Sequence, residues 1–226
     1  MSFKYVDLFR TSAEELLCAT LPSVLGTYGY NVVHGTTFLY GIGEIPIMLV
    51  AHVDTVHAQA PTLIVYDQEQ EVLWSPTGLG ADDRAGIAGI LELLDRGWKP
   101  HVLFLDLEES GCVGAKAAAN YLDAPNVRYI VELDRKGSND CVFYECVNKE
   151  FAAYVEKFGF KTTPGTLSDI STLCPAWGIA GVNLSIGYYD EHTKYERLMV
   201  NEWIRTIDRV EAMLNNVPDT QFEYVE

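Results

Sequence analysis

The sequence has few basic residues, and this shortage excludes several kinds of partner. It contains 16 lysine and arginine residues against 32 aspartate and glutamate residues, a formal charge of −16. Such a surface repels phosphate backbones and anionic lipids, which argues against binding to nucleic acids or membranes. No stretch is apolar and long enough for a membrane span or for the core of a signal peptide. We therefore expect a cytoplasmic protein.

Cysteines are also few, and they are scattered along the chain. Their number is odd and no CxxC pair occurs among Cys18, Cys112, Cys141, Cys146 and Cys174. This pattern argues against a disulfide framework and favours reduced cysteines that fill small spaces in a core. Cys112 follows two adjacent glutamates, but no histidine that could activate a thiol lies nearby in the sequence. We expect Cys112 to be a packed residue rather than a nucleophile.

Repeats, low-complexity tracts and an evident linker are absent as well, so we predict one domain over residues 1–226. Apolar runs alternate with helical patterns, which predicts an α/β domain with a mostly parallel central sheet and helices on both faces. The expected strands are 45–54, 101–106, 127–133, 160–162 and 182–186, with hairpins at 31–40 and 62–74 and a short element at 143–145. The expected helices are 5–19, 84–94, 114–122, 149–158, 168–173 and 200–214.

The most informative stretch is Ile45–Asp54, IPIMLVAHVD, an apolar run that ends in His52 and Asp54. An unbroken apolar run is typical of a buried parallel strand, and ligands of open α/β sheets bind where such strands end. Side chains two apart on a strand project to the same face, so Asp54 can accept a hydrogen bond from the His52 ring. This arrangement is how proteins orient a metal-binding imidazole.

Acidic residues and a second histidine follow the other expected strands or open a helix. Two imidazoles and several carboxylates suit zinc, or cobalt and manganese in the same geometry. An ordinary role is possible for each: an exposed acidic turn for the paired glutamates, and a favourable helix start for Asp82 and Asp83. We expect His34, His57 and His101 to be structural or surface residues. The candidate ligands are His52, Asp82, Glu108, Glu109, Asp134 and His192.

Five short segments resemble, in order and in context, the five metal-site motifs of the co-catalytic di-zinc exopeptidases. That group includes zinc aminopeptidases, tripeptidases, dipeptidases, carboxypeptidases and aminoacylase-like amidohydrolases. The resemblance covers most of the chain and implies a three-layer zinc-exopeptidase-like sandwich. The segments are Ala51–Thr55 (AHVDT), Gly80–Gly86 (GADDRAG), Leu107–Gly111 (LEESG), Glu132–Asp134 (ELD) and His192–Glu196 (HTKYE).

The resemblance also implies a role for each matching residue. Asp82 is expected to bridge two zinc ions, and the peptide that follows it is often cis in this group. One zinc ion is expected on His52 and Asp134, and the other on Glu109 and His192. Glu108 is the expected general base, and Asp54 the partner that orients His52. Many relatives insert a lid or dimerisation domain before the last motif, but the interval 134–192 is too short for one, so we expect a bare catalytic domain.

The chemistry of such a site explains why it needs these residue types. A bridging carboxylate lets two cations lie about 3.5–4 Å apart, where both can polarise one water and stabilise the intermediate formed on attack. A neighbouring carboxylate that binds no metal is still needed to take the proton from the water and deliver it to the leaving amine. Glu108 and Glu109 are adjacent, so we expect a local turn, helped by Ser110 and Gly111, to bring both into one site.

Candidate substrate contacts are Arg135, Asp169, Tyr188 and Tyr189. Arg135 either offsets nearby acids or clamps a substrate carboxylate in a bidentate manner. Ser168 and Asp169 resemble a Ser-Asp pair near the substrate wall of aminopeptidase-like members, or they form an ordinary helix cap. We expect Tyr188 or Tyr189 to donate a hydrogen bond to the developing oxyanion.

The sequence therefore predicts a zinc-dependent hydrolase with two Zn²⁺ ions that cleaves an amide bond of a small peptide or N-acyl amino acid. One alternative is an acyltransferase of the glutaminyl-cyclase type, which has a related scaffold and often one metal. The other is a degenerate member that binds metal as a scaffold without catalysis. The sequence predicts no particular oligomeric state.

Overall fold

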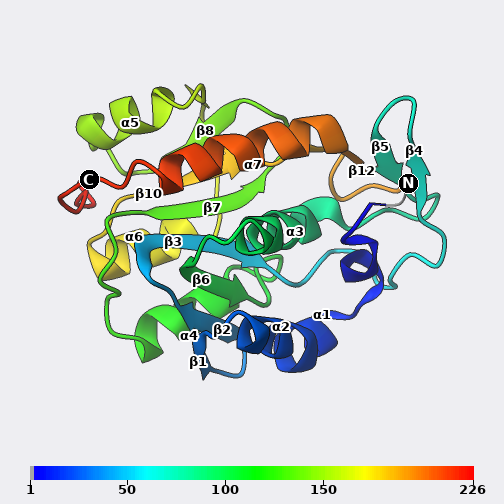
Figure 1. The fold of residues 1–226 in the computed structure, drawn as a ribbon, viewed down its shortest axis with the longest axis horizontal. Helices are drawn as coiled ribbons and strands as arrows, with labels where there is room; N and C mark the ends of the chain where they lie inside the picture. The colour runs from blue at the N-terminus through cyan, green and yellow to red at the C-terminus, as the bar shows by residue number, and fades with distance from the viewer. Residues whose placement is uncertain (1–2) are drawn as a thin grey trace.

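A central sheet of eight strands organises the computed structural model, which describes residues 3–226 (Figure 1). Its four middle strands are parallel to one another, and the strand on either side of them runs antiparallel to its middle neighbour. The prediction of a mostly parallel central sheet is therefore confirmed. In spatial order the strands are β1 (Asn31–His34), β2 (Phe38–Ile42), β6 (Pro100–Leu105), β3 (Ile45–His52), β7 (Ile130–Arg135), β10 (Gly181–Ser185), β8 (Asp140–Val142) and β9 (Lys161–Thr162).

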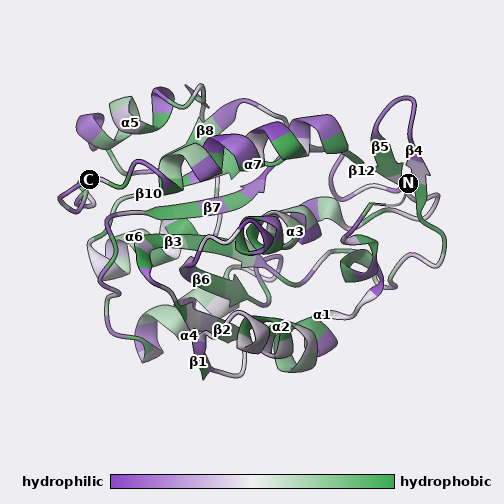
Figure 2. Ribbon diagram, in the orientation of Figure 1, coloured by the Kyte–Doolittle hydropathy of each residue, from purple (hydrophilic) through white to green (hydrophobic). Residues whose placement is uncertain are grey.

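Strand β3 is buried on both faces, which explains its unbroken apolar sequence. Ile47, Leu49 and Ala51 belong to the core on one side of the sheet, and Met48 and Val50 to the core on the other. All five side chains are fully buried. Figure 2 shows this apolar stretch of β3 beside helices whose surfaces alternate between hydrophilic and hydrophobic residues.

Helices cover both faces of the sheet, as predicted. On one face lie α3 (Ala81–Asp95), α7 (Val200–Leu214) and the N-terminal helices, and on the other lie α4 (Val113–Tyr121) and α6 (Ile170–Trp177). Helix α5 (Lys149–Glu156) packs beside β9. Within residues 3–226 no helix is both long and apolar enough to cross a membrane.

A second sheet of four short strands lies at one end of the molecule, beside the beginning of α3 (Figure 1). It joins the predicted hairpin of β4 (Val65–Asp67) and β5 (Val72–Trp74) to β11 (Tyr188–Tyr189) and β12 (Arg197–Met199). The loop that carries His192 therefore runs between β11 and β12, both of which belong to this small sheet.

Two predicted elements are corrected by the structure. The expected helix over 5–19 is a 3₁₀ turn, η1 (Val6–Arg10), followed by a new helix, because Ser12 caps that helix by accepting from the Glu15 N–H. The new helix continues through α1 (Ala13–Glu15), η2 (Leu16–Thr20) and α2 (Leu21–Thr27). The element expected at 143–145 is a turn, with the Cys146 N–H bonded to the Phe143 carbonyl, and the strand β8 precedes it.

Candidate metal centre

The register of the parallel strands brings the predicted ligands to one edge of the sheet. His52 is the last residue of β3, and it lies opposite Leu105 at the end of β6. On the other side of β3, Val50 lies opposite Glu132 of β7, two residues before Asp134. The loops that follow β6 and β7 therefore begin beside His52, as expected for a site at the carboxyl ends of strands.

His52 is almost completely buried, and both of its ring nitrogens face carboxylates. Its Nε2 atom lies 3.1 Å from Asp82 Oδ1 and 3.5 Å from Asp134 Oδ1. Its Nδ1 atom lies 3.2 Å from Asp54 Oδ1, on the opposite side of the ring. Asp54 is thus placed to fix the ring, while Nε2 is directed at Asp82 and Asp134.

His192 approaches the same aspartate from the other side. Its Nε2 atom lies 3.1 Å from Asp82 Oδ2 and 2.8 Å from Glu109 Oε1. Asp82 therefore presents a different carboxylate oxygen to each imidazole. The peptide between Asp82 and Asp83 is cis, as the resemblance implied.

The donor set fits one or two divalent cations. The ligand atoms form three overlapping groups, within each of which they lie no more than 4.8 Å apart. Glu109 Oε1 is buried and has no hydrogen-bond partner of acceptable geometry, as expected for an oxygen intended for a cation. The groups are His52, Asp82 and Asp134; His52, Glu108 and Glu109; and Asp82, Glu109 and His192.

The protonation of these side chains reflects how closely the acids are packed. Burial and the nearby Asp82 charge raise the pKa of Asp134 to about 8 and that of Glu109 to about 7. The hydrogen bond to Asp82 raises the pKa of His192 to about 9. A cation at this position would compensate the crowded negative charge and displace the protons.

A turn before Glu108 brings both glutamates into the site. Leu107 has a positive φ of 62°, so the chain reverses before the glutamate pair rather than only at Ser110 and Gly111. The N–H groups of Glu108 and Glu109 then donate to the two oxygens of Asp54, at 3.0 and 3.1 Å. Asp54 therefore orders this turn as well as the His52 ring, a second role that the sequence did not reveal.

Glu108 lines the open side of the site. It shares a cavity of about 310 Å³ with Asp82, Glu109, Asp134 and His192. Burial raises the pKa of Glu108, and the charges of Asp82 and Asp54 act in the same direction. The result is a carboxylate of increased basicity directed at the space beside the predicted ligands.

Asp134 is held by a hydrogen-bond network that the sequence analysis missed. Its backbone N–H donates to Asn183 Oδ1 at 3.0 Å, and Asn183 Nδ2 donates to its carbonyl at 2.8 Å. Ser168 Oγ donates to its carboxylate at 3.3 Å, and also to the buried Glu132. Glu132 is the first residue of the ELD segment, so only its position two residues before a predicted ligand could have suggested a role.

Two of the four candidate substrate contacts, Arg135 and Tyr188, line the cavity. Arg135 Nη2 donates to Thr163 Oγ1 at 3.1 Å and to the Pro164 carbonyl at 3.3 Å, while its Nε is buried without a partner. The Tyr188 hydroxyl donates to Asp134 Oδ1 at 3.1 Å. Both side chains therefore lie where a substrate could reach them.

The other two candidates, Tyr189 and Asp169, do not line this cavity, which corrects their predicted place in the site. The Tyr189 hydroxyl donates to Glu202 of α7 at 2.6 Å, because neighbouring residues of a strand point to opposite sides. Asp169 is fully buried, its two carboxylate oxygens have no partner, and its side chain makes no capping bond to α6. The alternative interpretation of Asp169 as a side-chain cap is therefore also incorrect.

Comparisons with known proteins identify a family and several similar folds. Residues 39–161 match the family model described as peptidase family M28. No curated protein sequence matches the chain. Among solved structures, aminopeptidase PepT from Bacillus cereus has 18% identity and a TM-score of 0.74, with 93% of this chain and 96% of that chain covered.

Two further solved structures have similar folds. A tripeptidase from Staphylococcus aureus has 15% identity and a TM-score of 0.75, with 94% of this chain and 96% of that chain covered. Glutaminyl cyclase from Porphyromonas gingivalis has 17% identity and a TM-score of 0.63, with 94% of both chains covered. At these identities the likeness establishes a shared fold.

Proposed function

The family model covers more than half of the 226 residues, so the chain belongs to peptidase family M28 and is a metallopeptidase, and we propose that it is a two-zinc exopeptidase. Its substrate would be a small peptide or an N-acyl amino acid. The observation that carries this proposal is Asp82, whose two carboxylate oxygens each face a different histidine. A carboxylate in that position can bridge two cations.

The chain's own residues divide into two ligand sets around Asp82. His52 and Asp134 would complete one zinc site, and Glu109 and His192 the other. Cobalt or manganese could occupy the same donors. Bound zinc ions supply Lewis-acid polarisation of the attacking water and of the scissile carbonyl.

Glu108 is the proposed general base. Its backbone is fixed by the bond to Asp54, and its carboxylate has a raised pKa, so it accepts a proton more readily than an exposed glutamate. It would take a proton from the attacking water and deliver that proton to the departing amine nitrogen. The amine then leaves as a neutral group, and Glu108 returns to its ionised form.

Arg135 and Tyr188 would contact two different groups of the substrate, its carboxylate and the oxyanion that forms on attack. The position of Arg135 on the cavity wall supports a role in binding a substrate carboxylate, although its Nη2 already has partners. We therefore expect faster cleavage of a dipeptide than of its C-terminal amide, and equal kcat/KM values would contradict the role of Arg135. The Tyr188 hydroxyl is the proposed oxyanion donor, so Tyr188→Phe should lower kcat, and unchanged turnover would contradict that role.

The decisive test is a metal assay combined with a substrate panel. The purified protein is analysed for metal content, treated with a chelator and reconstituted with zinc, cobalt or manganese. Each form is then assayed on aminoacyl and N-acyl amino acid substrates. We expect two metal ions per chain and activity that is lost on chelation and restored on reconstitution. A fully loaded protein that hydrolyses no member of the panel would instead support the degenerate scaffold.

A second candidate function is glutaminyl cyclisation, which the similarity to two glutaminyl cyclase structures favours. A peptide with N-terminal glutamine distinguishes the two reactions, because cyclisation releases ammonia and leaves the peptide bond intact, whereas exopeptidase action releases free glutamine. We expect free glutamine. Ammonia release from the intact peptide would establish the second function.

We also propose that the chain forms a single catalytic domain and works in the cytoplasm. Support for one domain comes from the segment between Asp134 and His192, whose strands all join the two sheets. Support for a reducing compartment comes from the five cysteines, which are unpaired and of which four are buried.

A further inference from the structure

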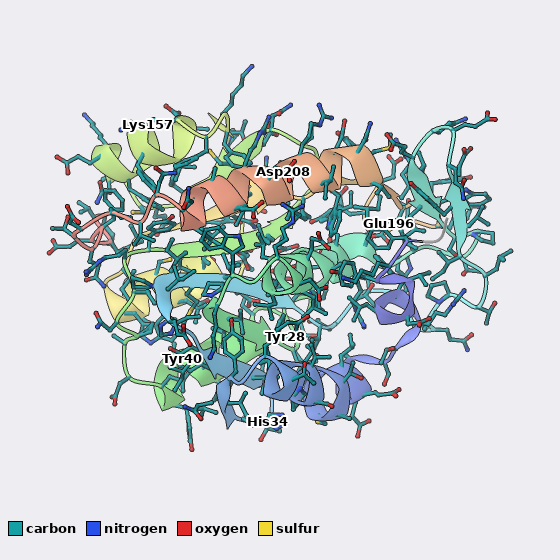
Figure 3. The ribbon with its side chains drawn as sticks, in the orientation of Figure 1. Tyr28, His34, Tyr40, Lys157, Glu196 and Asp208 are labelled. Carbon is teal, nitrogen blue, oxygen red and sulfur yellow. The ribbon has the colours of Figure 1, made fainter. Side chains whose placement is uncertain are left out.

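Glu196 is a buried carboxylate that connects two ligand-bearing segments of the candidate metal centre. It follows His192 by four residues and immediately precedes β12, and its exposed fraction is 1%. In Figure 3 it lies between the beginning of α3 and the small sheet. It belongs to the HTKYE segment, but neither the resemblance nor the proposed function gives it a role.

Three donors converge on the Glu196 carboxylate. Its Oε1 accepts a hydrogen bond from the backbone N–H of Asp82 at 3.1 Å. Its Oε2 accepts from the backbone N–H of Gly80 and faces His57 Nε2 at 3.0 Å. Gly80 has a positive φ of 70°, a conformation that glycine adopts without steric cost and that turns its N–H toward the same carboxylate as that of Asp82.

His57 holds the other side of Glu196. The hydrogen bond to Glu196 raises the pKa of His57, so a proton on Nε2 is favoured and the ring donates to the carboxylate. The ring can approach because residue 78 is glycine: a Cβ atom on Gly78 would lie 2.3 Å from the ring. His57, which we expected to be a structural or surface residue, therefore contacts the carboxylate that accepts from the Asp82 N–H.

The hydrogen bond from the Asp82 N–H to Glu196 holds the backbone of a proposed metal ligand. Asn183 holds the backbone of Asp134, and Asp54 holds the backbone of Glu109. Glu196 acts on Asp82 in the corresponding way, since it binds the N–H of the one ligand that is shared by both proposed metal sites. It does so from the loop that carries His192, and it thereby links the two ligands that face each other at 3.1 Å.

We propose that Glu196 is a positioning residue that fixes Asp82 relative to His192, and that His57 orients Glu196 for this role. The proposal rests on the two-zinc function above and concerns mainly the site formed by Asp82, Glu109 and His192. Loss of a residue that orients metal ligands typically weakens metal binding by about 10–100-fold. The other proposed site should change less, because His52 and Asp134 have their own supports in Asp54 and Asn183.

The test uses Glu196→Gln in the full chain. A glutamine has nearly the same shape but only one acceptor oxygen, so its NH₂ group must face the N–H donor of Asp82 or those of Gly80 and His57. Zinc binding to the metal-free protein is followed by titration calorimetry, and metal content is measured after dialysis. We expect one of two zinc sites to weaken by at least about tenfold, with a drop in kcat and little change in KM.

Glu211→Gln is the matched control. Glu211 also accepts hydrogen bonds, from Trp98 at 2.7 Å and Arg96 at 2.5 Å, but it lies on α7 in a different cluster. This control should lower the melting temperature without changing either zinc affinity. Unchanged zinc affinities in Glu196→Gln, or equal weakening of both sites, would overturn the proposal.

A milder variant decides the question if Glu196→Gln does not fold. His57→Gln leaves the bonds from Asp82 and Gly80 intact, and it should weaken the same single site by a smaller factor. Unchanged zinc binding in this variant would overturn the proposal.

Failure of the proposed function can be distinguished from failure of this inference. Wild-type protein that binds two zinc ions but cleaves no substrate contradicts only the exopeptidase function. Wild-type protein with a single zinc site contradicts both.

Discussion

The two ends of helix α3 both gather carboxylates, but they neutralise them in different ways. At its C-terminal end Arg96 contacts three acids: Glu92 at 3.1 Å, Asp208 at 2.9 Å and Glu211 at 2.5 Å. A basic residue there is also favoured by the helix dipole. At its N-terminal end Asp82 meets Glu109 and Asp134, and in the part of the chain that the structure describes only imidazoles form ion pairs with these three acids.

The acids at the two ends of α3 also differ in how deeply they are buried. The acids around Arg96 have side chains that are 21–59% exposed, so solvent screens them and each ion pair contributes little to stability. The side chains of Asp82, Asp134 and Glu109 are at most 15% exposed. Buried carboxylates without a cation are costly, and the chain can stabilise them with protons or with a metal. One end of α3 thus carries its own cation, and the other is built to receive one.

The largest expected effect at the N-terminal end is on catalysis. Glu108→Gln should lower kcat by about 10²–10⁴, the usual contribution of a general base, while both zinc ions remain bound. Steady-state kinetics and metal analysis of the same sample check this. A variant that loses metal instead would show that Glu108 is a ligand and would reassign the general base.

The next effect concerns metal content and compares the two ends directly. Asp82→Asn removes the charge of the proposed bridge, and we expect the bound zinc to fall from two ions to one or none after dialysis. Asp208→Asn makes the same chemical change in the Arg96 cluster and should leave the zinc content unchanged. If both variants kept two zinc ions, the result would contradict the claim that the acids at the N-terminal end of α3 bind metal.

Metal removal should destabilise the protein as a whole. At a free zinc concentration about 1,000 times the Kd, one site stabilises the native state by about 4 kcal/mol. For a domain of this size, each occupied site would then contribute roughly 8–16 °C to the decrease in Tm on chelation. Calorimetric scans with and without chelator measure it. Arg96→Met protein should show the same decrease, because its missing cation lies at the other end of the helix.

The smallest effect is the pH dependence of the Arg96 cluster. Hydrogen bonds from Trp98 and Arg96 lower the pKa of Glu211 below its ordinary value of 4.5. A lowered carboxylate pKa stabilises the folded state above the unfolded pKa, and this contribution is lost as the pH falls through the folded pKa. Wild type should therefore have a higher Tm than Glu211→Gln at pH 7, and the difference should disappear in strong acid. A constant difference would show that the ionised form of Glu211 is not responsible.

The sequence predicted those parts of the molecule that have local signals. The apolar run before His52 indicated a doubly buried strand, and the five motifs indicated which acids would meet at its end. The predicted start of the first helix was wrong. The apolar periodicity begins before Ser12, but the helix begins after it, because the Ser12 side chain caps the helix by accepting from the Glu15 N–H. Such a cap competes with a continuous helix on nearly equal terms, so the pattern alone could not decide.

The supports of the candidate site were not predictable in the same way. Asp54 binds the N–H groups of residues 54 and 55 positions further along the chain, and Glu196 binds the Asp82 N–H 114 positions away. No short-range pattern encodes such contacts, because they depend on where two loops meet. Tyr189 was misplaced for a related reason: which of two neighbouring tyrosines faces the cavity depends on the register of β11 against β12.

The parallel register of β6, β3, β7 and β10 also has a consequence for engineering. All candidate ligands lie at the carboxyl edge of these strands, while the connections at 96–99, 123–129 and 178–180 lie at the opposite edge, where the strands begin. Insertions or affinity tags at exposed positions of those connections, such as Gly97 and Asp123, would be separated from the metal centre by the full length of the strands. The sheet thus offers one edge that can be redesigned while the chemistry at the other is preserved.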